Sequence, residues 1–145
     1  MTGRPELGTP GRTTSTARIV AWPAAAAADL VAVVVFVAIG RRSHAESSAL
    51  AGLAHTAWPF LSGALIGWLI SRGWRAPTAL KPTGLAVWLA SAAGGMVLRA
   101  VSGQGVAASF VVVATIVLGM FFIGWRVIGW RVAVRIVHRR RSGSR

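Results

Sequence analysis

Four long apolar segments, separated by short connections, constrain this chain most strongly. They run over residues 19–40, 50–70, 83–101 and 106–127. A helix of about 20 residues, rising about 1.5 Å per residue, crosses the roughly 30 Å hydrocarbon layer of a bilayer. We therefore expect an all-α integral membrane bundle of four transmembrane helices, and the short connections predict an up-down-up-down order.

Composition supports the membrane class, since 54% of the residues are hydrophobic and only 13% are charged. Residues 1–18 are rich in Gly, Pro, Thr and Arg, without an apolar period, and predict a disordered cytoplasmic arm. Residues 19–127 form the predicted membrane domain, and 128–145 a basic cytoplasmic tail. Cleavage of a signal peptide near Ala45 is the competing interpretation of the first segment, and Arg41 and Arg42 before that position argue against it.

Basic residues predict the orientation, because positively charged loops stay in the cytoplasm. With the N-terminus inside, only Arg41, Arg42 and Arg99 of the 16 Lys and Arg residues fall on the outer side. We therefore expect a multi-pass protein of the cell membrane with both termini in the cytoplasm. Tryptophans favour the membrane boundary; those expected at the inner boundary are Trp22, Trp74, Trp125 and Trp130, that at the outer boundary is Trp58, and those expected to pack inside are Trp68 and Trp88.

The net charge of +13 does not indicate a nucleic-acid-binding protein, because the basic residues lie between apolar segments and in the tail. The partners expected instead are the bilayer, anionic lipid at the tail, and a second copy or another membrane protein. In the tail, Arg131, Arg135 and Arg139 repeat at helical spacing, which is typical of a helix that lies on or leaves the inner leaflet. A simple stop-transfer anchor would have the same pattern.

Asp29 is the only acid in a predicted span. Ionised side chains at such depth cost about 2.5 kcal/mol or more, so something must compensate the carboxyl group. It could remain protonated and exchange protons or respond to ions during transport. Alternatively, it could bond to a Ser, Thr or backbone carbonyl on a neighbouring helix. We estimate that Arg99 lies too far along the membrane normal to form a salt bridge with Asp29.

A second candidate site gathers at the predicted outer mouth. Guanidinium groups bind phosphate or carboxylate through paired hydrogen bonds. The cluster could therefore hold an anion or a lipid headgroup, or it could be a solvated rim that anchors helix ends. Its members are Arg41, Arg42, His44, Arg99 and Gln104.

No metal site, cofactor or enzyme activity is expected. His44, Glu46 and His55 match no zinc spacing, and the chain has no cysteine. No phosphate-binding glycine loop or nucleophile–base pair occurs in the sequence. Small residues at four-residue spacing instead indicate close helix packing, within the bundle or between copies; these are Gly63, Gly67, Ala90 and Gly94.

Several short motifs resemble the domain-of-unknown-function 3054 family of small actinobacterial membrane proteins. The resemblance covers roughly residues 25 to 127 and implies four membrane spans and no assigned activity. The motifs are Asp29-Leu30, Phe36, the run 40–44, Ala57-Trp58-Pro59-Phe60, Gly67-Trp68, Arg99, the run 102–105 and Ser109-Phe110.

Two functional hypotheses remain open from the sequence. The first is a small transporter or channel-like protein for a proton-coupled or anionic solute, in which water reaches Asp29. The second is a non-catalytic membrane scaffold or assembly subunit that binds lipid or a partner protein, in which Asp29 stays dry.

Overall fold

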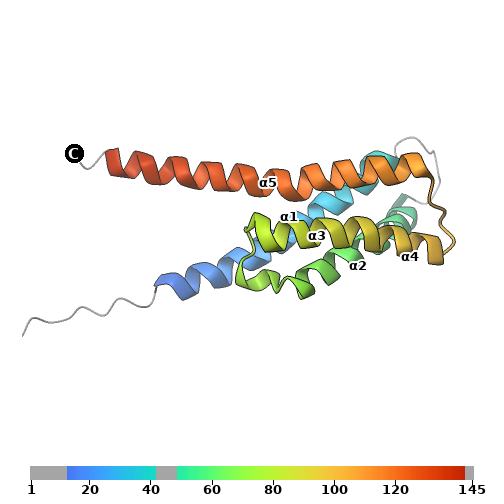
Figure 1. The fold of residues 1–145 in the computed structure, drawn as a ribbon, viewed down its shortest axis with the longest axis horizontal. Coiled ribbons are helices and arrows are strands. Elements are labelled where there is room, and N and C mark those ends of the chain that lie inside the picture. Colours follow the sequence, from blue (N-terminus) through green and yellow to red (C-terminus); the bar gives the residue numbers. More distant parts are fainter. Residues whose placement is uncertain (1–12, 42–48, 143–145) are drawn as a thin grey trace, which may run out of the picture.

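The computed structural model describes residues 13–41 and 49–142, and all its regular elements there are helical (Figure 1). The long helices are α1 (Thr13–Arg41), α2 (Ala49–Ile70) and α5 (Ala108–Ser142). Between α2 and α5, a short 3₁₀ turn η1 (Gly73–Arg75) precedes a segmented helix. Its parts are η2 (Leu80–Gly84), α3 (Leu85–Leu89), η3 (Ala90–Gly94) and α4 (Gly95–Val101).

Four helices are long and apolar enough to cross a membrane. Their apolar stretches are Trp22–Arg41, Leu50–Ile70, Leu80–Val101 and Ala108–Val132. The all-helical fold class predicted from the sequence is thus confirmed, and the protein belongs to the membrane class. The up-down-up-down crossing of a bilayer stays a prediction.

The helix boundaries differ from the expected ones in two informative places. Helix α1 begins at Thr13 rather than at residue 19, while residues 1–12 of the predicted arm lie outside the described part. Helix α5 continues without a break to Ser142, so no structural boundary separates the span that was expected to end at Val127 from the basic tail. The apolar stretch of α5 therefore extends further than its sequence prediction.

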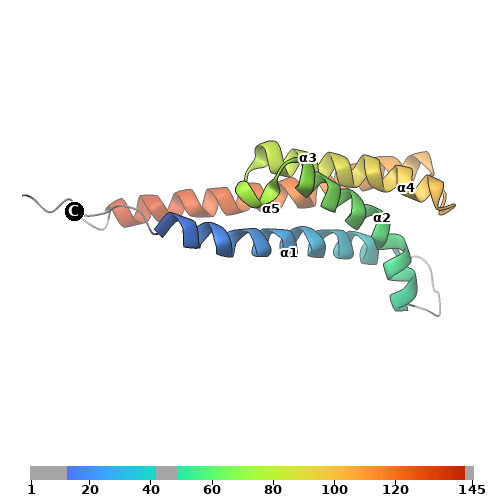
Figure 2. The same cartoon turned by 90° about the horizontal axis from the view of Figure 1, so that it is seen from below.

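The two ends of the bundle have different contents. The start of α1, the end of α5 and the η1–η2 connection lie toward one end, which we call the terminal end (Figures 1 and 2). The connection from α4 to α5 lies at the opposite end, which we call the turn end. There Gly103 and Gly105 have positive φ angles of 71° and 74°, which glycine adopts without strain.

Proline shapes two of the helices. Pro59 lies inside α2, where it removes one backbone hydrogen bond, and α2 bends along its length (Figure 2). In η2, Pro82 follows Lys81, and the residue before a proline favours extended backbone angles. Lys81 has such angles, so the regular helix of the third span starts only after it, near the predicted start at Thr83.

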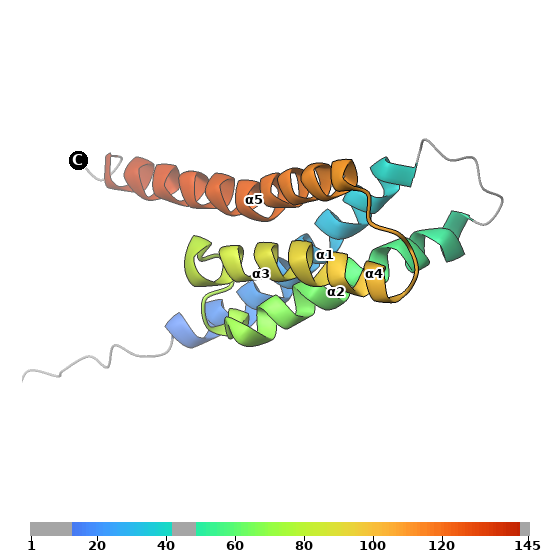
Figure 3. The same cartoon turned by 45° about the vertical axis from the view of Figure 1, so that its right-hand side comes forward.

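The core lies where α1, α2, α3 and α5 meet (Figure 3). Its centre is apolar and well packed, with Val33, Phe60, Val87, Leu118 and Phe122 fully buried. Many large apolar side chains face outward instead, among them Ile70, Val113, Ile116 and Met120. An exposed apolar surface of this kind is what lipid, rather than water, would cover.

Candidate functional site

Asp29 lies in a cage of nitrogen donors between three helices. Its side chain is buried, and the residue is 2% exposed. Arg126 donates from Nη1 to Oδ1 at 2.8 Å and from Nη2 to Oδ2 at 2.7 Å. The indole nitrogens of Trp125 and Trp68 donate to Oδ1 and Oδ2, each at 2.9 Å. Each carboxylate oxygen therefore accepts two hydrogen bonds.

Arg126 is as enclosed as its partner. The residue is 1% exposed, and its guanidinium lies 4.4 Å from the ring centre of Trp125. Nη1 also donates to the carbonyl of Phe122 at 2.8 Å, one turn earlier in α5. Gly84 makes room for this side chain, because an added Cβ there would lie 3.0 Å from Cδ of Arg126. The Nε atom has no hydrogen-bond partner among the described residues.

This arrangement joins helices far apart in the sequence. Asp29 belongs to α1, Trp68 to α2, and Trp125 and Arg126 to α5. Paired forks of this kind are the strongest geometry for an ion pair, and a buried pair is tolerated only when its hydrogen bonds are nearly complete. The cluster, which we call the Asp29 cage, thus ties the first helix to the last.

Sequence reasoning missed the partner of Asp29. It expected a neutral carboxyl or a bond to Ser, Thr or backbone, and it assigned Arg126 and Trp125 to the inner membrane boundary. The cause is the end assigned to the fourth span at Val127, which put Arg126 at the edge of the span, whereas the apolar stretch continues to Val132. The signal that could have revealed the pair was one acid, Asp29, in the first span and an arginine, Arg126, inside the last span. Trp68 was expected to pack inside, and it also donates to the carboxylate.

At the turn end, Arg99 and Gln104 come together, but as partners of each other. Arg99 donates to Oε1 of Gln104 at 3.0 Å and, at 3.3 Å each, to the carbonyls of Gln104 and Gly105. Its guanidinium also lies 4.7 Å from the ring centre of Phe110. Arg99 therefore closes the turn between α4 and α5.

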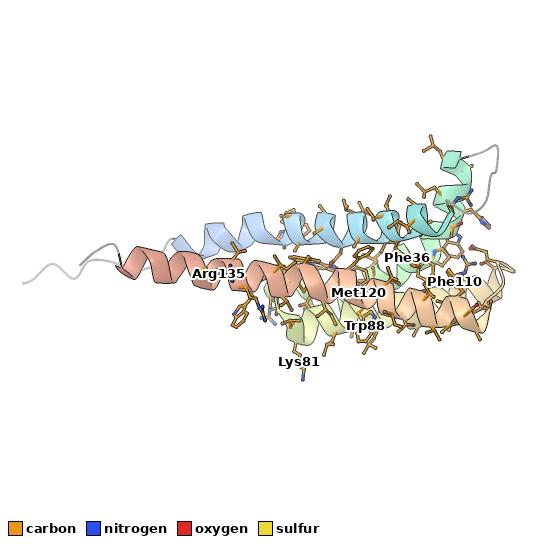
Figure 4. The ribbon with its side chains drawn as sticks, turned by 90° about the horizontal axis from the view of Figure 1, so that it is seen from above. Phe36, Lys81, Trp88, Phe110, Met120 and Arg135 are labelled. Carbon is orange, nitrogen blue, oxygen red and sulfur yellow. The ribbon has the colours of Figure 1, made fainter. Side chains whose placement is uncertain are left out.

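An aromatic group lies directly beneath this turn. Phe36 and Phe110 lean toward one another from α1 and α5, as Figure 4 shows, with ring centres 6.3 Å apart. Phe60 of α2 completes the group, with centres 5.3 Å from Phe36 and 6.1 Å from Phe110. Between the Asp29 cage and the turn end, the bundle is thus filled by aromatic and aliphatic side chains.

The other members of the predicted anion cluster are only partly described. Arg41 donates from Nη1 to Oγ1 of Thr56 at 3.4 Å and lies against Gly52 of α2. Arg42 and His44 lie outside the described residues, as does Glu46 of the imagined metal site. Within residues 13–41 and 49–142, no group of three His, Cys, Asp or Glu side chains could hold a metal ion.

The packing glycines lie inside the bundle. A Cβ at Gly67 would lie 2.6 Å from Cα of Val87, and one at Gly63 would collide with the carbonyl of Ala90. Gly94 lies close by, because a Cβ on it would be 3.6 Å from Cα of Gly63. The small residues thus let α2 and the third span approach at backbone distance within one copy of the chain.

Comparisons with known proteins identify the family and nothing more specific. No curated protein and no solved structure matches the chain. The family model described as "Protein of unknown function (DUF3054)" matches residues 26–129. The match includes the whole Asp29 cage and the turn closed by Arg99. The resemblance noted in the sequence is thereby confirmed, and the chain belongs to the DUF3054 family.

Proposed function

We propose that this protein is a non-catalytic membrane scaffold or assembly subunit, and that the Asp29 cage holds its first and last helices in one arrangement. The observation that carries the proposal is the saturation of the carboxylate. Four N–H groups occupy its two oxygens, including both terminal nitrogens of a buried arginine. A group bound in this way is suited to fixing helices rather than to exchanging protons.

The surroundings of Asp29 also weigh against a transport route through one copy of the chain. Val33 lies one helical turn from Asp29 toward the turn end and is 0% exposed. Phe60 and Leu118 are fully buried beside it in the same core. Proton relays and ion paths line water-filled cavities. The closely packed core on the turn-end side of Asp29 argues for the scaffold over the proton-coupled transporter that the sequence left open.

The same saturation argues against an enzyme in which Asp29 acts as a general base. A base must lie within hydrogen-bond reach of the proton that it abstracts. Here every approach to the carboxylate is taken by tryptophan and arginine donors, so a substrate would first have to displace the ion pair.

Orientation and partners form part of the proposal. We place the terminal end in the cytoplasm of the cell, because Arg72, Arg75 and Lys81 lie in the connection at that end, while Arg41 and Arg99 belong to helix ends at the other. Arg131 and Arg135 are exposed on the C-terminal part of α5, where Figure 4 labels Arg135. These arginines suit anionic lipid or an acidic segment of a partner, at about 1 kcal/mol for each charge near an anionic surface.

Thiol labelling tests the scaffold against the transporter. The chain has no cysteine, so Val33→Cys and Ser102→Cys each introduce a single thiol. In intact cells and with the proposed orientation, a membrane-impermeant reagent should label Ser102→Cys, which is exposed in the turn, and leave Val33→Cys unmodified. Rapid labelling at Val33 would reveal a water path to Asp29 and favour transport.

A further inference from the structure

A groove runs along the outside of the bundle between α1 and α2. It has a volume of about 740 Å³ and is bordered by one stripe from each helix. On α1 the stripe is Trp22, Ala26 and Leu30, and on α2 it is Leu61, Leu65 and Leu69, each at four-residue spacing. Residues four apart share one helix face, so the groove has two straight apolar walls.

The floor and one end of the groove are also defined. Trp68 and Asp29 lie at the floor, where the carboxylate oxygens are already bonded within the Asp29 cage. Trp74 of η1 lines the groove at the terminal end. A Cβ on Gly73 would collide with the ring of Trp68, so η1 is seated directly on the floor residue. With its polar group already satisfied, the groove suits an apolar occupant rather than an ion or a sugar.

The length of the groove matches one leaflet of a bilayer. From Trp22 to Leu30 the α1 wall advances eight residues, about 12 Å at helical rise. Half of a roughly 30 Å hydrocarbon layer is about 15 Å. Trp22 and Trp74 are both partly exposed at the terminal end of the groove, and tryptophans favour the headgroup level. The walls therefore extend from the headgroup region toward the bilayer midplane.

Charge beside Trp74, at the terminal end of the groove, indicates the kind of headgroup. Arg72 and Arg75 flank Trp74 in the chain and are exposed, and no acid lies in the segment from Ser71 to Pro82. Guanidinium groups bind phosphate through paired hydrogen bonds. A second copy of this chain, with a net charge of +13, would be repelled from the same place.

We propose that the groove between α1 and α2 binds one anionic phospholipid of the leaflet at the terminal end, with an acyl chain between the two stripes and its phosphate at Arg72 and Arg75. The site deepens the scaffold role proposed above and rests on it. It is distinct from the turn-end arginines and from the tail, where the sequence had placed lipid contacts.

The test uses the full chain reconstituted into vesicles of phosphatidylethanolamine and phosphatidylglycerol in equal amounts, then extracted in mild detergent for native mass spectrometry. The wild type should retain one phosphatidylglycerol per chain. Ala27→Phe places a ring in the groove from an exposed position of α1 and should lower the retained fraction about tenfold, the equivalent of about 1.4 kcal/mol. Ala24→Phe makes the same change at an exposed α1 position outside the groove lining and should retain the lipid.

The headgroup contact has its own pair of variants. Arg72→Asn with Arg75→Gln should lower retention of phosphatidylglycerol about tenfold and remove its preference over phosphatidylethanolamine. Arg131→Gln with Arg135→Gln removes the same charge from the tail, which attracts anionic lipid without a groove to hold it, and should lower retention by less than about twofold. An equal loss in both double variants would overturn the headgroup contact. Equal retention by Ala27→Phe and Ala24→Phe would overturn the site.

A change from dimer to monomer in Ala27→Phe without loss of lipid would also overturn the proposal, because it would place a second copy in the groove. Failure of the scaffold role would appear separately, as labelling of Val33→Cys.

Discussion

Arg126 and Arg99 both lie within apolar helices of this protein, and they are compensated in different ways. Arg126 is fully buried and faces a carboxylate with both terminal nitrogens. Arg99 is half-buried near the end of α4 and faces the neutral oxygens of Gln104 and Gly105 and the ring of Phe110. The first needs a full opposite charge because no water reaches it, while the second lies close enough to the helix end for dipoles to suffice.

The fold depends on Arg126 more than on Arg99. Removing one member of a buried ion pair leaves the other charge stranded in a medium that cannot solvate it. Removing an arginine that faces neutral groups leaves only ordinary acceptors, which water at the helix end can satisfy. Each of the following experiments tests that contrast between the cage and the turn.

Asp29→Asn should have the largest effect. It leaves the Arg126 guanidinium buried without its counter-charge, and we expect a loss of about 3–5 kcal/mol in the free energy of unfolding. Denaturant titration of the protein in detergent micelles measures it. The double variant Asp29→Asn with Arg126→Met removes the stranded charge and should recover part of the loss. A single variant as stable as the wild type would show that the pair does not hold the bundle.

Trp68→Phe should cause the second-largest loss in the free energy of unfolding. It removes one N–H donor to the carboxylate, and hydrogen bonds to charged groups contribute about 1.5–3 kcal/mol. Trp88→Phe is the matched control, since Trp88 donates at the same 2.9 Å to a neutral carbonyl, that of Thr115. The control should lose about 0.5–1.5 kcal/mol in the same unfolding titration. Equal losses would remove the distinction between charged and neutral acceptors on which the contrast depends.

Gly67→Ala tests whether the close packing of α2 against the third span, beside the cage, contributes to the free energy of unfolding. The added methyl group meets backbone atoms of Ala86 and Val87, which cannot rotate away, and overpacking of this kind costs about 1–3 kcal/mol. Gly124→Ala has open space around its Cβ and should gain up to about 1 kcal/mol of helix propensity. If both variants unfold at the same denaturant concentration, α2 and the third span can separate freely.

Arg99→Gln should have the smallest effect. It gives up hydrogen bonds to neutral acceptors and the contact with Phe110, and we expect a loss of about 0.5–1.5 kcal/mol. The same titration, run beside Asp29→Asn, compares the two sites directly. A loss as large as that of Asp29→Asn would mean that Arg99 carries a buried charge of equal weight, and the contrast between cage and turn would fail.

The sequence predicted the helices much better than the contacts between them. Apolar length alone located all four spans, because a helix that crosses hydrocarbon needs about 20 apolar residues. The small residues at Gly63 and Gly67 indicated a packing face. Neither signal says which helices meet, and so the approach of α2 to the third span required the structure.

The Asp29 cage could not be predicted from the sequence, for a physical reason. The depth of each residue in the membrane was counted from the predicted ends of the spans, and the apolar part of α5 continues past the predicted end at Val127. That error placed Arg126 at the membrane interface. Its partner Asp29 lies 97 residues earlier in the chain, so no local sequence pattern links the two. At the turn end, the predicted order of the helices correctly placed Arg99 near Gln104. The sequence could not distinguish an arginine that binds an anion from one that closes a turn.

The cage also has a consequence for the order in which the protein is made. Synthesis proceeds from the N-terminus, so Asp29 enters the membrane with α1 before Arg126 has been translated. Until α5 follows, the charged acid, which costs about 2.5–3.5 kcal/mol at the centre of an inserted helix, depends on the apolar remainder of α1 to stay in place. A chain that stops before Arg126 would keep three complete apolar spans and an acid without its counter-charge. Completion of the last helix is thus the step at which the buried Asp29 gains its counter-charge.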